Sequence, residues 1–398
     1  MTDTILICGA GFGQVPAIEA ARGLGIRSIV VDRDANAPGM ALADIAETVD
    51  IVDIGAVVAV ARRHKVGAAI TLQSDIGVPT VGAVVDALGL KGNGRAVADR
   101  CSNKIETRKA LAAAGVPQPR FAVASRESEA LEEARRIGSP CVVKAPDSSG
   151  SRGVVKVTAE ESVPAAYAEA MQYSRVGLVL VEEFIDGYET GAQAFSLNGK
   201  CVSVQVHNDF MSSPPFMIPV GHSFPSALPP EGHAKVEAAI AACVDALGIL
   251  WGPSNIDLIL RADGTPAIIE VGARLGATCL PELVTCYTGV DWVSAAVHTG
   301  FGREPSLVSA LRQPCAAFIL EAPADGVLSA VHLPHDMLAR DDVLEFEVTV
   351  EPGARVSQLR KGTDRIGKIV TRGKTVSDAE EMALAIREAV CFDVAPDA

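Results

Sequence analysis

A lysine followed by a loop of small residues restricts the local structure of this sequence more than any other feature. Residues 141–143 read as a short buried strand that ends at Lys144, and the loop 148–153 precedes a second extended run, Val154–Val157. Small residues let the backbone approach a bound anion, and glycine permits the positive φ that turns N–H groups toward it. The lysine precedes the glycines, so this is not a Walker A motif. The segment predicts a phosphate-binding loop. From these residues alone, a Gly/Ser hairpin with a surface lysine stays an equal alternative.

Charge and cysteine content argue against several classes of protein. The 398 residues suggest two or three domains, and their formal net charge of −14 argues against a nucleic-acid-binding surface. Nine cysteines occur without a CxxC pair, which fits reduced thiols, and seven histidines form no HExxH or Cys/His cluster, so we expect no zinc site. No apolar run reaches the ~18 residues of a membrane span, and residues 1–13 lack the pattern of a signal peptide. We therefore expect a cytoplasmic protein without nucleic-acid or membrane partners.

Short buried strands alternate with helical segments over residues 1–100, which predicts an open α/β domain with a parallel sheet. The strand 4–8 leads into a glycine turn that departs from the dinucleotide fingerprint at Gln14, which occupies the third glycine position. We therefore expect this turn to pack helix on strand rather than to bind NAD. Asp75 follows the strand 68–72, where open α/β sheets place ligands; helix capping is the alternative role.

Two acidic residues on neighbouring strands predict a metal site. If Asp263 and Gly264 form a two-residue turn, Asp257 lies directly opposite Glu270, with Cβ atoms about 4.5–5.5 Å apart. Like charges in this position destabilise a sheet, and Mg²⁺ accepts one or two protein carboxylates together with phosphate and water oxygens. A turn with a bulge would shift the register by one, and an edge hairpin with solvated acids is the alternative. Arg274, four residues after Glu270, could bind a carboxylate or phosphoryl oxygen beside the metal.

The lysine strand, the glycine loop, the triplet Glu182-Glu183-Phe184 and the carboxylate hairpin occur in the order found in the ATP-grasp superfamily, which this sequence resembles over most of its length. The resemblance implies an α/β protein with three domains. These are an N-terminal open α/β (pre-ATP-grasp) domain at about 1–100, a two-lobed ATP-grasp core with a mobile lid at about 101–310, and a small C-terminal α+β domain at 311–398. The lid lobe would span about 115–190. The implied cofactors are ATP and Mg²⁺, with Mn²⁺ as an alternative ion.

The resemblance also implies a role for each matching residue. Lys104 and Lys144 would contact the ATP phosphates and the adenine side, Glu189 would bind the ribose hydroxyls, and Arg274 would steady an acyl phosphate. The other implied site residues are the closing loop (Ser148, Ser149, Gly150, Ser151 and Gly153), the hinge around adenine (Glu182, Glu183, Phe184 and Ile185), the metal ligands Asp257 and Glu270, and the substrate-side residues Asp75, His222, Arg274 and Gly276.

Within the superfamily, residues 221–225 and 365–368 look most like the L-amino-acid ligase branch. This implies that a substrate carboxylate attacks the γ-phosphate of ATP and that an amine then displaces phosphate from the acyl phosphate. In a long loop predicted at 207–230, His222 would pair with a substrate carboxylate or act as a base; a histidine that only satisfies the loop backbone is the alternative. The predicted partners are small carboxylate and amine substrates, and a homodimer is a possible assembly.

Two positions depart from the family pattern. Asn103 stands where aspartate usually precedes the first lysine, and Gly272 replaces the asparagine of the Glu-x-Asn metal motif, so a second Mg²⁺ would be held weakly or by another residue. Two other functions stay open. A carboxylase or formyl-transferring enzyme of the purine or biotin-carboxylase type shares the same core, although the lack of a biotin-carrier segment disfavours carboxylation. A non-catalytic nucleotide-binding protein is the third possibility, against which the intact Lys144, Asp257 and Glu270 argue.

Overall fold

The structure, a computed structural model, describes residues 3–148, 150, 152–213 and 218–396, which form two compact units. Unit 1 comprises 1–204, 228–277 and 291–307, and unit 2 comprises 205–227, 278–290 and 308–398. This division differs from the consecutive domains predicted from the sequence. Two segments of the predicted core, 205–227 and 278–290, join the C-terminal region in unit 2.

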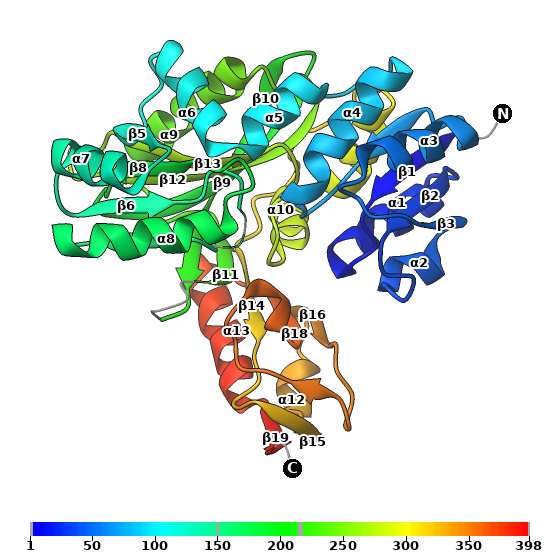
Figure 1. Cartoon of the computed structure of the whole chain (residues 1–398). Helices are drawn as coiled ribbons and strands as arrows, with labels where there is room; N and C mark the ends of the chain where they lie inside the picture. The colour runs from blue at the N-terminus through cyan, green and yellow to red at the C-terminus, as the bar shows by residue number, and fades with distance from the viewer. Residues whose placement is uncertain (1–2, 149, 151, 214–217, 397–398) are drawn as a thin grey trace. The chain divides into compact units, whose positions relative to one another are not determined.

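The first sheet of unit 1 is parallel, as the alternation of strands and helices predicts (Figure 1). Helices connect its strands because parallel neighbours need a crossover. Leu6 and Ile29, whose side chains are fully buried, belong to the core beneath these helices. In sheet order the strands are β3 (Ile45–Thr48), β2 (Arg27–Asp32), β1 (Thr4–Cys8) and β4 (Ala68–Ile70); the helices are α1 (Val15–Gly23), α2 (Pro38–Leu42), α3 (Ile54–His64) and α4 (Val78–Leu88), with the 3₁₀ turns η1 (Phe12–Gln14) and η2 (Asp75–Gly77).

The glycine turn after β1 is closed by a glutamine. Gln14 Nε2 donates to the carbonyl of Leu72 at 2.9 Å, and the Leu72 N–H donates to Gln14 Oε1 at 2.8 Å. The same side chain fills the space beside Gly9, since a Cβ on Gly9 would lie 3.3 Å from Gln14 Cγ. Gln14 is buried, so the turn uses its third position for packing, as the sequence analysis expects.

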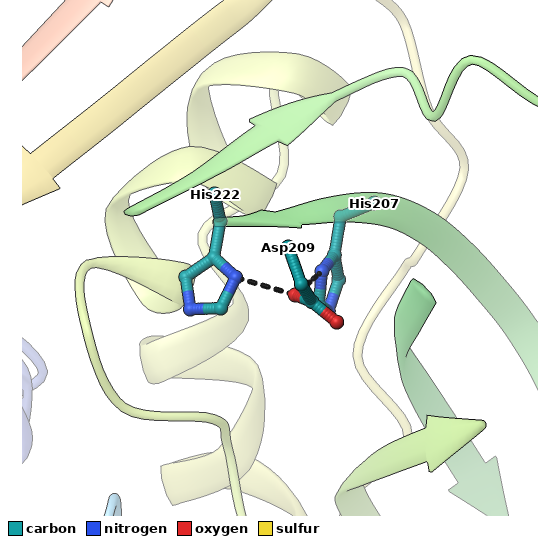
Figure 2. Close-up of side chains that lie close together, drawn as sticks. All are labelled: His207, Asp209 and His222. Atoms are coloured by element: carbon teal, nitrogen blue, oxygen red, sulfur yellow. Dashed lines mark hydrogen bonds and ion pairs between the residues drawn. The ribbon is translucent and has the colours of Figure 1, made fainter. Parts of the chain in front are cut away.

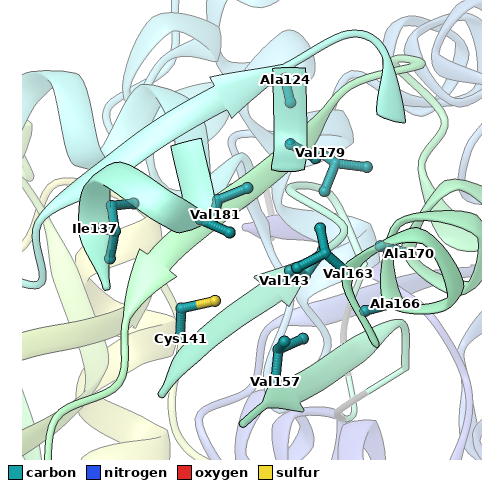
Figure 3. Close-up of a cluster of buried hydrophobic side chains, with 12 residues drawn as sticks. Ala124, Ile137, Cys141, Val143, Val157, Val163, Ala166, Ala170, Val179 and Val181 are labelled. Atoms are coloured by element: carbon teal, nitrogen blue, oxygen red, sulfur yellow. The ribbon is translucent and has the colours of Figure 1, made fainter. Parts of the chain in front are cut away.

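A four-stranded antiparallel sheet carries the lysine strand (Figure 3). Two helices pack on it, and the core between them consists of valines, alanines and single Ile and Cys side chains. Alanines such as Ala166 and Ala170 let a helix approach the buried Val143 closely. In sheet order the strands are β5 (Phe121–Ala124), β8 (Val179–Glu183), β6 (Cys141–Lys144) and β7 (Val154–Val157); the helices are α7 (Glu127–Ile137) and α8 (Val163–Tyr173), with the 3₁₀ turn η3 (Glu160–Ser162).

A second antiparallel sheet carries the carboxylate hairpin. Its unit 1 strands are β9 (Gly187–Leu197), β12 (Gly252–Arg261) and β13 (Pro266–Gly272), and the helices of this region are α5 (Arg95–Ser102), α6 (Lys104–Ala113), α9 (Pro230–Leu247) and α11 (Trp292–Gly300). Helices α5, α6 and α9 pack against β13. The next strand, β10 (Lys200–Met211), follows β9 through Asn198 and Gly199, whose φ values of 49° and 75° confirm the predicted hairpin turn. Strand β10 enters unit 2 at Gln205.

One sequence prediction was wrong in unit 2: most of the described part of the predicted loop 207–230 is strand. Residues 207–211 continue β10, and β11 (Pro219–Phe224) pairs with it. A helix packs on the sheet of this unit and buries Phe318 and Ile369. The other elements are the sheet neighbours β14 (Cys315–Leu320), β18 (Gly367–Arg372) and β16 (Val343–Val348), a small sheet of β17 (Arg355–Val356), β15 (Gly326–His332) and β19 (Cys391–Ala395), the helices α10 (Leu280–Thr288), α12 (His335–Leu338) and α13 (Val376–Ala389), and the 3₁₀ turn η4 (Gly362–Asp364). None of the helices among the described residues is long and apolar enough to cross a membrane.

Candidate functional site

The carboxylate hairpin has a different turn from the predicted one but the predicted pairing. Arg261 N–H donates to the Thr265 carbonyl at 3.0 Å, so three residues form the turn, and Gly264 takes a φ of 76° there. The two-residue turn was therefore wrong, and Leu258 pairs with Ile268 one position out of the predicted register. Between Leu258 and Asp257 the pairing is irregular, because β13 contributes one extra residue there. This extra residue restores the predicted register at Asp257. As a result, Asp257 does lie directly opposite Glu270.

Neighbouring polar groups offset part of the repulsion between the two acids. Lys104 Nζ lies 2.9 Å from Glu270 Oε1, and Asn255 Nδ2 donates to Asp257 Oδ1 at 3.0 Å. Lys104 begins α6, where the Asn103 side chain accepts a hydrogen bond from the N–H of Ile105 and so fixes the start of the helix. The Glu270 side chain is 39% exposed, so one side of this carboxylate remains accessible to a ligand.

A buried ion-pair network joins Lys144, at the end of β6, to Glu182 and Arg108. Arg108 Nε lies 2.6 Å from Glu182 Oε1, and Lys144 Nζ lies 2.6 Å from Glu182 Oε2. Arg108 also donates to the backbone carbonyls of Ile268 and Ile269 on β13, at 3.0 and 2.7 Å. One arginine thus joins α6, β8 and the carboxylate hairpin. Its side chain is 0% exposed, and those of Glu182 and Lys144 are 3% and 6% exposed.

Burial has the largest effect on both pKa values in this network, and the neighbouring charges act beside it. Burial lowers the pKa of Lys144, and the neighbouring Arg108 and Lys104 lower it further, while Glu182 opposes them. Burial raises the pKa of Glu182, but Lys144 and Arg108 outweigh it and hold that pKa below its ordinary value. Burial and nearby cations disfavour the charged form of Lys144. A bound anion would stabilise that charged form, so this position suits a phosphate.

Arg274 is held in a bidentate ion pair with Asp75. Arg274 Nε and Nη2 lie 2.8 and 2.7 Å from the two Asp75 oxygens, and both side chains are largely buried. Burial raises the pKa of Asp75, but Arg274 and Lys104 more than offset it and lower that pKa overall. The N–H of Gly276 donates to Gln193 Oε1 at 2.8 Å. The backbone N–H of Gly276, a predicted substrate residue, is therefore already engaged by the protein itself. The fold therefore joins Arg274 and Asp75 in one ion pair, although they lie 199 residues apart in the sequence.

The Asp75 carboxylate explains the glycine at position 272. A Cβ there would lie 2.7 Å from Asp75 Oδ1 and 3.0 Å from Arg274 Cζ, closer than packing allows. We expect Gly272→Asn, which restores the family motif, to lower the free energy of unfolding by about 1–3 kcal/mol through overpacking. Gly362→Asn is the control, because no heavy atom lies within 4 Å of the equivalent position. Urea unfolding that is unchanged in Gly272→Asn would show that the Asp75 carboxylate moves away without cost.

The described part of the glycine loop folds back on the lysine residues. Lys104 Nζ donates to the Ser148 carbonyl at 2.8 Å, and Ser148 Oγ donates to the Arg152 carbonyl at 2.7 Å. Gly150 and Gly153 have φ values of 67° and 64°, a conformation that favours glycine. The predicted loop residues Ser149 and Ser151 lie outside the described residues.

An open hollow of about 530 Å³, counting the solvent at its mouth, connects these groups. Its lining brings together four predicted site residues from four different segments of unit 1, namely Asp75, Lys104, Ser148 and Glu270. Arg175 also lines it and donates to the Asp147 carbonyl at 2.6 Å. The hollow therefore combines a lysine, an arginine and the carboxylates of Asp75 and Glu270 next to a glycine-rich loop.

The predicted hinge residues differ in how much of each remains for a ligand. The Glu182 carboxylate is buried in its ion pairs, and Glu183 is paired with Arg261 at 2.8 and 3.1 Å. Lys156 Nζ lies 3.5 Å from the centre of the Phe184 ring, a cation–π contact. The other two predicted residues here differ in exposure: Ile185 is 6% exposed, whereas Glu189 is exposed on β9. A ligand at this hinge would meet backbone groups rather than the Glu182 and Glu183 carboxylates.

His222 lies in unit 2 beside two other polar residues (Figure 2). Its Nδ1 is 2.7 Å from Asp209 Oδ1, and His207 Nδ1 is 2.9 Å from the same oxygen. Burial raises the pKa of Asp209, but the two imidazoles outweigh it and hold that pKa well below its ordinary value. Burial lowers the pKa of His222, and Asp209 only partly offsets this. The trio therefore consists of a carboxylate between two imidazoles, and the pKa of His222 lies below its ordinary value.

Sequence reasoning missed several residues that organise these sites. Arg108 carries the buried network, Gln193 bridges to Asn255 at 2.6 Å, and Asp209 lies between His207 and His222. The spacing of His207 and Asp209 was visible, since residues two apart share a face of a strand. No local signal identifies the partners of Arg108 or Gln193, which lie far away in the sequence.

Comparisons with known proteins identify two families along the chain. Residues 101–278 match the family described as ATP-grasp domain, and residues 318–395 match the one described as L-amino acid ligase C-terminal domain 2. A formate-dependent phosphoribosylglycinamide formyltransferase from Saccharolobus solfataricus is 33% identical over 191 residues, which cover 46% of each chain. The chain thus matches about half the length of this curated relative.

Two solved structures share the fold over nearly the whole chain. Phosphoribosylglycinamide synthetase from Anaerococcus prevotii gives a TM-score of 0.84 at 26% identity and covers 99% of this chain and 100% of its own. An L-amino acid ligase from Bacillus licheniformis gives a TM-score of 0.84 at 21% identity and covers 99% of both chains. The architecture of the chain therefore agrees with these two structures.

Proposed function

We propose that this chain, a member of the ATP-grasp superfamily of enzymes, joins a small carboxylate substrate to an amine at the expense of ATP. The observation that carries the proposal is the pair Asp257 and Glu270, which oppose each other on adjacent strands with Lys104 at one of them. Glu270 and Lys104 line the same hollow as Ser148 of the glycine loop. Opposed carboxylates, a lysine and a glycine-rich loop are the groups that binding a metal–triphosphate requires.

The two carboxylates fit Mg²⁺, and Mn²⁺ as a similar ion. Both are oxygen donors on rigid strands, they lie directly opposite each other, and the Glu270 carboxylate is accessible. Asp257 and Glu270 would hold the ion, which when bound supplies positive charge to the triphosphate. Gly272 offers no ligand, so a second ion would depend on the phosphates and water.

The chain's own residues would position ATP and stabilise charge. Lys104 and Lys144 would contact phosphate oxygens, and the loop containing Ser148, Gly150 and Gly153 would close over them, with Ser149 and Ser151 as further loop residues. Backbone groups of residues 183–185 would bind adenine, and Glu189 the ribose. Phosphoryl transfer of this kind depends on positioning and on electrostatic stabilisation more than on covalent chemistry by the protein.

On the substrate side, the same proposal uses Arg274. Arg274 presents a guanidinium that Asp75 fixes in one orientation, so it can steady an acyl phosphate without first becoming ordered. The reaction would begin with attack of the substrate carboxylate on the γ-phosphate, and an amine would then displace phosphate from the acyl phosphate. ADP, phosphate and a C–N bonded product would result.

An L-amino acid is our preferred carboxylate because residues 318–395 match an L-amino acid ligase C-terminal domain. A formyl-transferring or carboxylating reaction is the second candidate, favoured by the 33% identity to a formate-dependent formyltransferase over 191 residues. The two candidates share the metal and phosphate residues and differ in the acid that is activated.

A coupled ATPase screen with mass detection distinguishes these functions. The purified chain is incubated with Mg–ATP and pairs of L-amino acids, and separately with formate or bicarbonate and an amine acceptor. We expect phosphate release only with an amino-acid pair, together with a product whose mass equals both acids minus one water. Product with formate or bicarbonate alone would favour the second candidate. Nucleotide binding without phosphate release in any reaction would leave only a nucleotide-binding protein.

A further inference from the structure

A histidine–aspartate–histidine cluster lies on one face of the β10–β11 hairpin. Asp209 pairs directly with His222 across the two strands, so their side chains project on the same face. His207 precedes Asp209 by two residues in β10 and therefore shares that face. Figure 2 shows the Asp209 carboxylate between the two imidazole rings. The hairpin alone is thus sufficient to assemble the cluster.

The three side chains converge on one point. Both Nδ1 atoms approach the same carboxylate oxygen, at 2.7 Å from His222 and 2.9 Å from His207. One ligand atom from each residue lies within 4.8 Å of the others. Two ligands in a tetrahedral arrangement around an ion with bonds of about 2.1 Å are about 3.4 Å apart, so each Nδ1 atom and the Asp209 oxygen would separate by roughly 0.5–0.7 Å to become neighbouring ligands of one metal ion.

The surroundings favour an ion that binds nitrogen. His207 and His222 are only 1% and 5% exposed, and the Phe224 ring lies 5.3 Å from the His207 ring. An apolar shell limits the access of water to such a ligand set. Imidazole nitrogens suit Zn²⁺ and other first-row transition ions, whereas Mg²⁺ prefers oxygen ligands. The side chain of Asp209 is 15% exposed, which leaves a route to the cluster.

We propose that His207, Asp209 and His222 form a binding site for a transition-metal ion of the Zn²⁺ type. The site belongs to unit 2 and differs in its ligands from the Asp257–Glu270 pair of unit 1. Three protein ligands leave at least one position for water or for a small ligand with an oxygen or nitrogen donor. The inference differs from the expectation of no zinc site, which rested on motifs that a strand hairpin does not produce. It is independent of the proposed function, because the ion would bind without ATP.

Calorimetry with zinc tests the site directly. The full chain is stripped with a chelator, dialysed and titrated with Zn²⁺ in the absence of nucleotide and Mg²⁺. We expect one ion per chain, and a rise in the thermal unfolding temperature when Zn²⁺ is added, since a ligand that binds the folded state stabilises it. His207→Asn and Asp209→Asn should each weaken binding more than about tenfold. Asparagine retains a hydrogen-bonding amide near the Nδ1 position, so the His207 variant separates loss of a metal ligand from loss of a hydrogen bond.

His332→Asn is the matched control. His332 Nε2 lies 2.8 Å from Asp393, so this variant also removes a histidine–aspartate pair, but an exposed one with a single imidazole. Its zinc affinity should equal that of the unaltered chain. X-ray absorption of the zinc-loaded unaltered chain adds a measurement that needs no variant, and it should show nitrogen and oxygen ligands with imidazole scattering. Absence of zinc binding, a sulfur ligand shell from the nine cysteines, or equal affinity in all variants would each overturn the proposal.

Discussion

Glu270→Gln is expected to lower the rate of ATP-dependent product formation by roughly 100-fold or more, the loss typical when one preorganised electrostatic group is removed. Glutamine has nearly the shape of glutamate and can still accept a hydrogen bond from Lys104, which lies 2.9 Å from Glu270 Oε1. It cannot provide the negative charge that, with Asp257, would hold the metal ion. Initial rates with saturating Mg–ATP measure the effect, and calorimetric titration with Mn²⁺ and ATP should show weaker ion binding independently of turnover.

Glu106→Gln is the matched control for this change. Glu106 forms a Lys–Glu pair of similar length with Lys109, at 2.8 Å, and its side chain is 45% exposed. Both variants should keep an unfolding free energy close to that of the unaltered chain, because partly exposed pairs contribute roughly 0–1 kcal/mol. Only Glu270→Gln should lose activity. If it instead lowers the unfolding free energy by more than about 2 kcal/mol while the folded fraction stays active, Glu270 is a structural residue and the metal assignment is wrong.

The sequence predicted the pairing of the two carboxylates but not the turn and the bulge that produce it. Two apolar runs around a turn indicate a hairpin, and the pairing of Asp257 with Glu270 is confirmed. The reason given for that pairing was wrong, because a three-residue turn shifts the register and an irregularity next to Asp257 shifts it back. A bulge depends on how the whole sheet twists and packs, so the local sequence does not specify it.

The motif order was a stronger guide than any single motif. The ATP-grasp resemblance and the α/β fold are confirmed by the family matches and by the solved structures. In contrast, the segment 207–230 was predicted as a loop, since its prolines and serines obscure the alternation of β10 and β11. That error concealed His207 and Asp209 as partners of His222. Residue roles at the site remain predictions that the experiments above test.

The buried network around Arg108 could not be predicted from the sequence at all. Arg108 lies on α6, four residues after Lys104, where an exposed face would be the ordinary expectation. Its partners are 74 residues away at Glu182 and 160 residues away at Ile268. Such contacts arise only once the strands are assembled, and the structure shows them joining the lysine strand's sheet to the carboxylate hairpin.

Glu182→Gln is expected to lower the free energy of unfolding at pH 7 by about 3–5 kcal/mol, the range for a buried ion pair that loses one partner. The change leaves Arg108 and Lys144 buried without the carboxylate that both contact at 2.6 Å. Glutamine retains the size of the side chain, so the loss reflects charge rather than a cavity. Urea unfolding measures it, with Glu106→Gln as the exposed control. A loss below about 1 kcal/mol would place Glu182 among weak surface pairs and contradict the network.

The pH dependence of this loss gives a further test of the same network. The pKa of Glu182 is lower in the folded protein than its ordinary value, because Lys144 and Arg108 outweigh the effect of burial. A carboxyl group of this kind stabilises the fold fully above the pKa of the unfolded chain, about 4.3 for glutamate, and that stabilisation is lost as the pH falls toward the folded pKa. The difference in unfolding free energy between the unaltered chain and Glu182→Gln should therefore be constant from about pH 6 to 8 and should narrow below about pH 4.3. A difference that instead widened on acidification would mean that the folded protein raises the pKa of Glu182 above its value in the unfolded chain, which would contradict its pairing with Lys144 and Arg108.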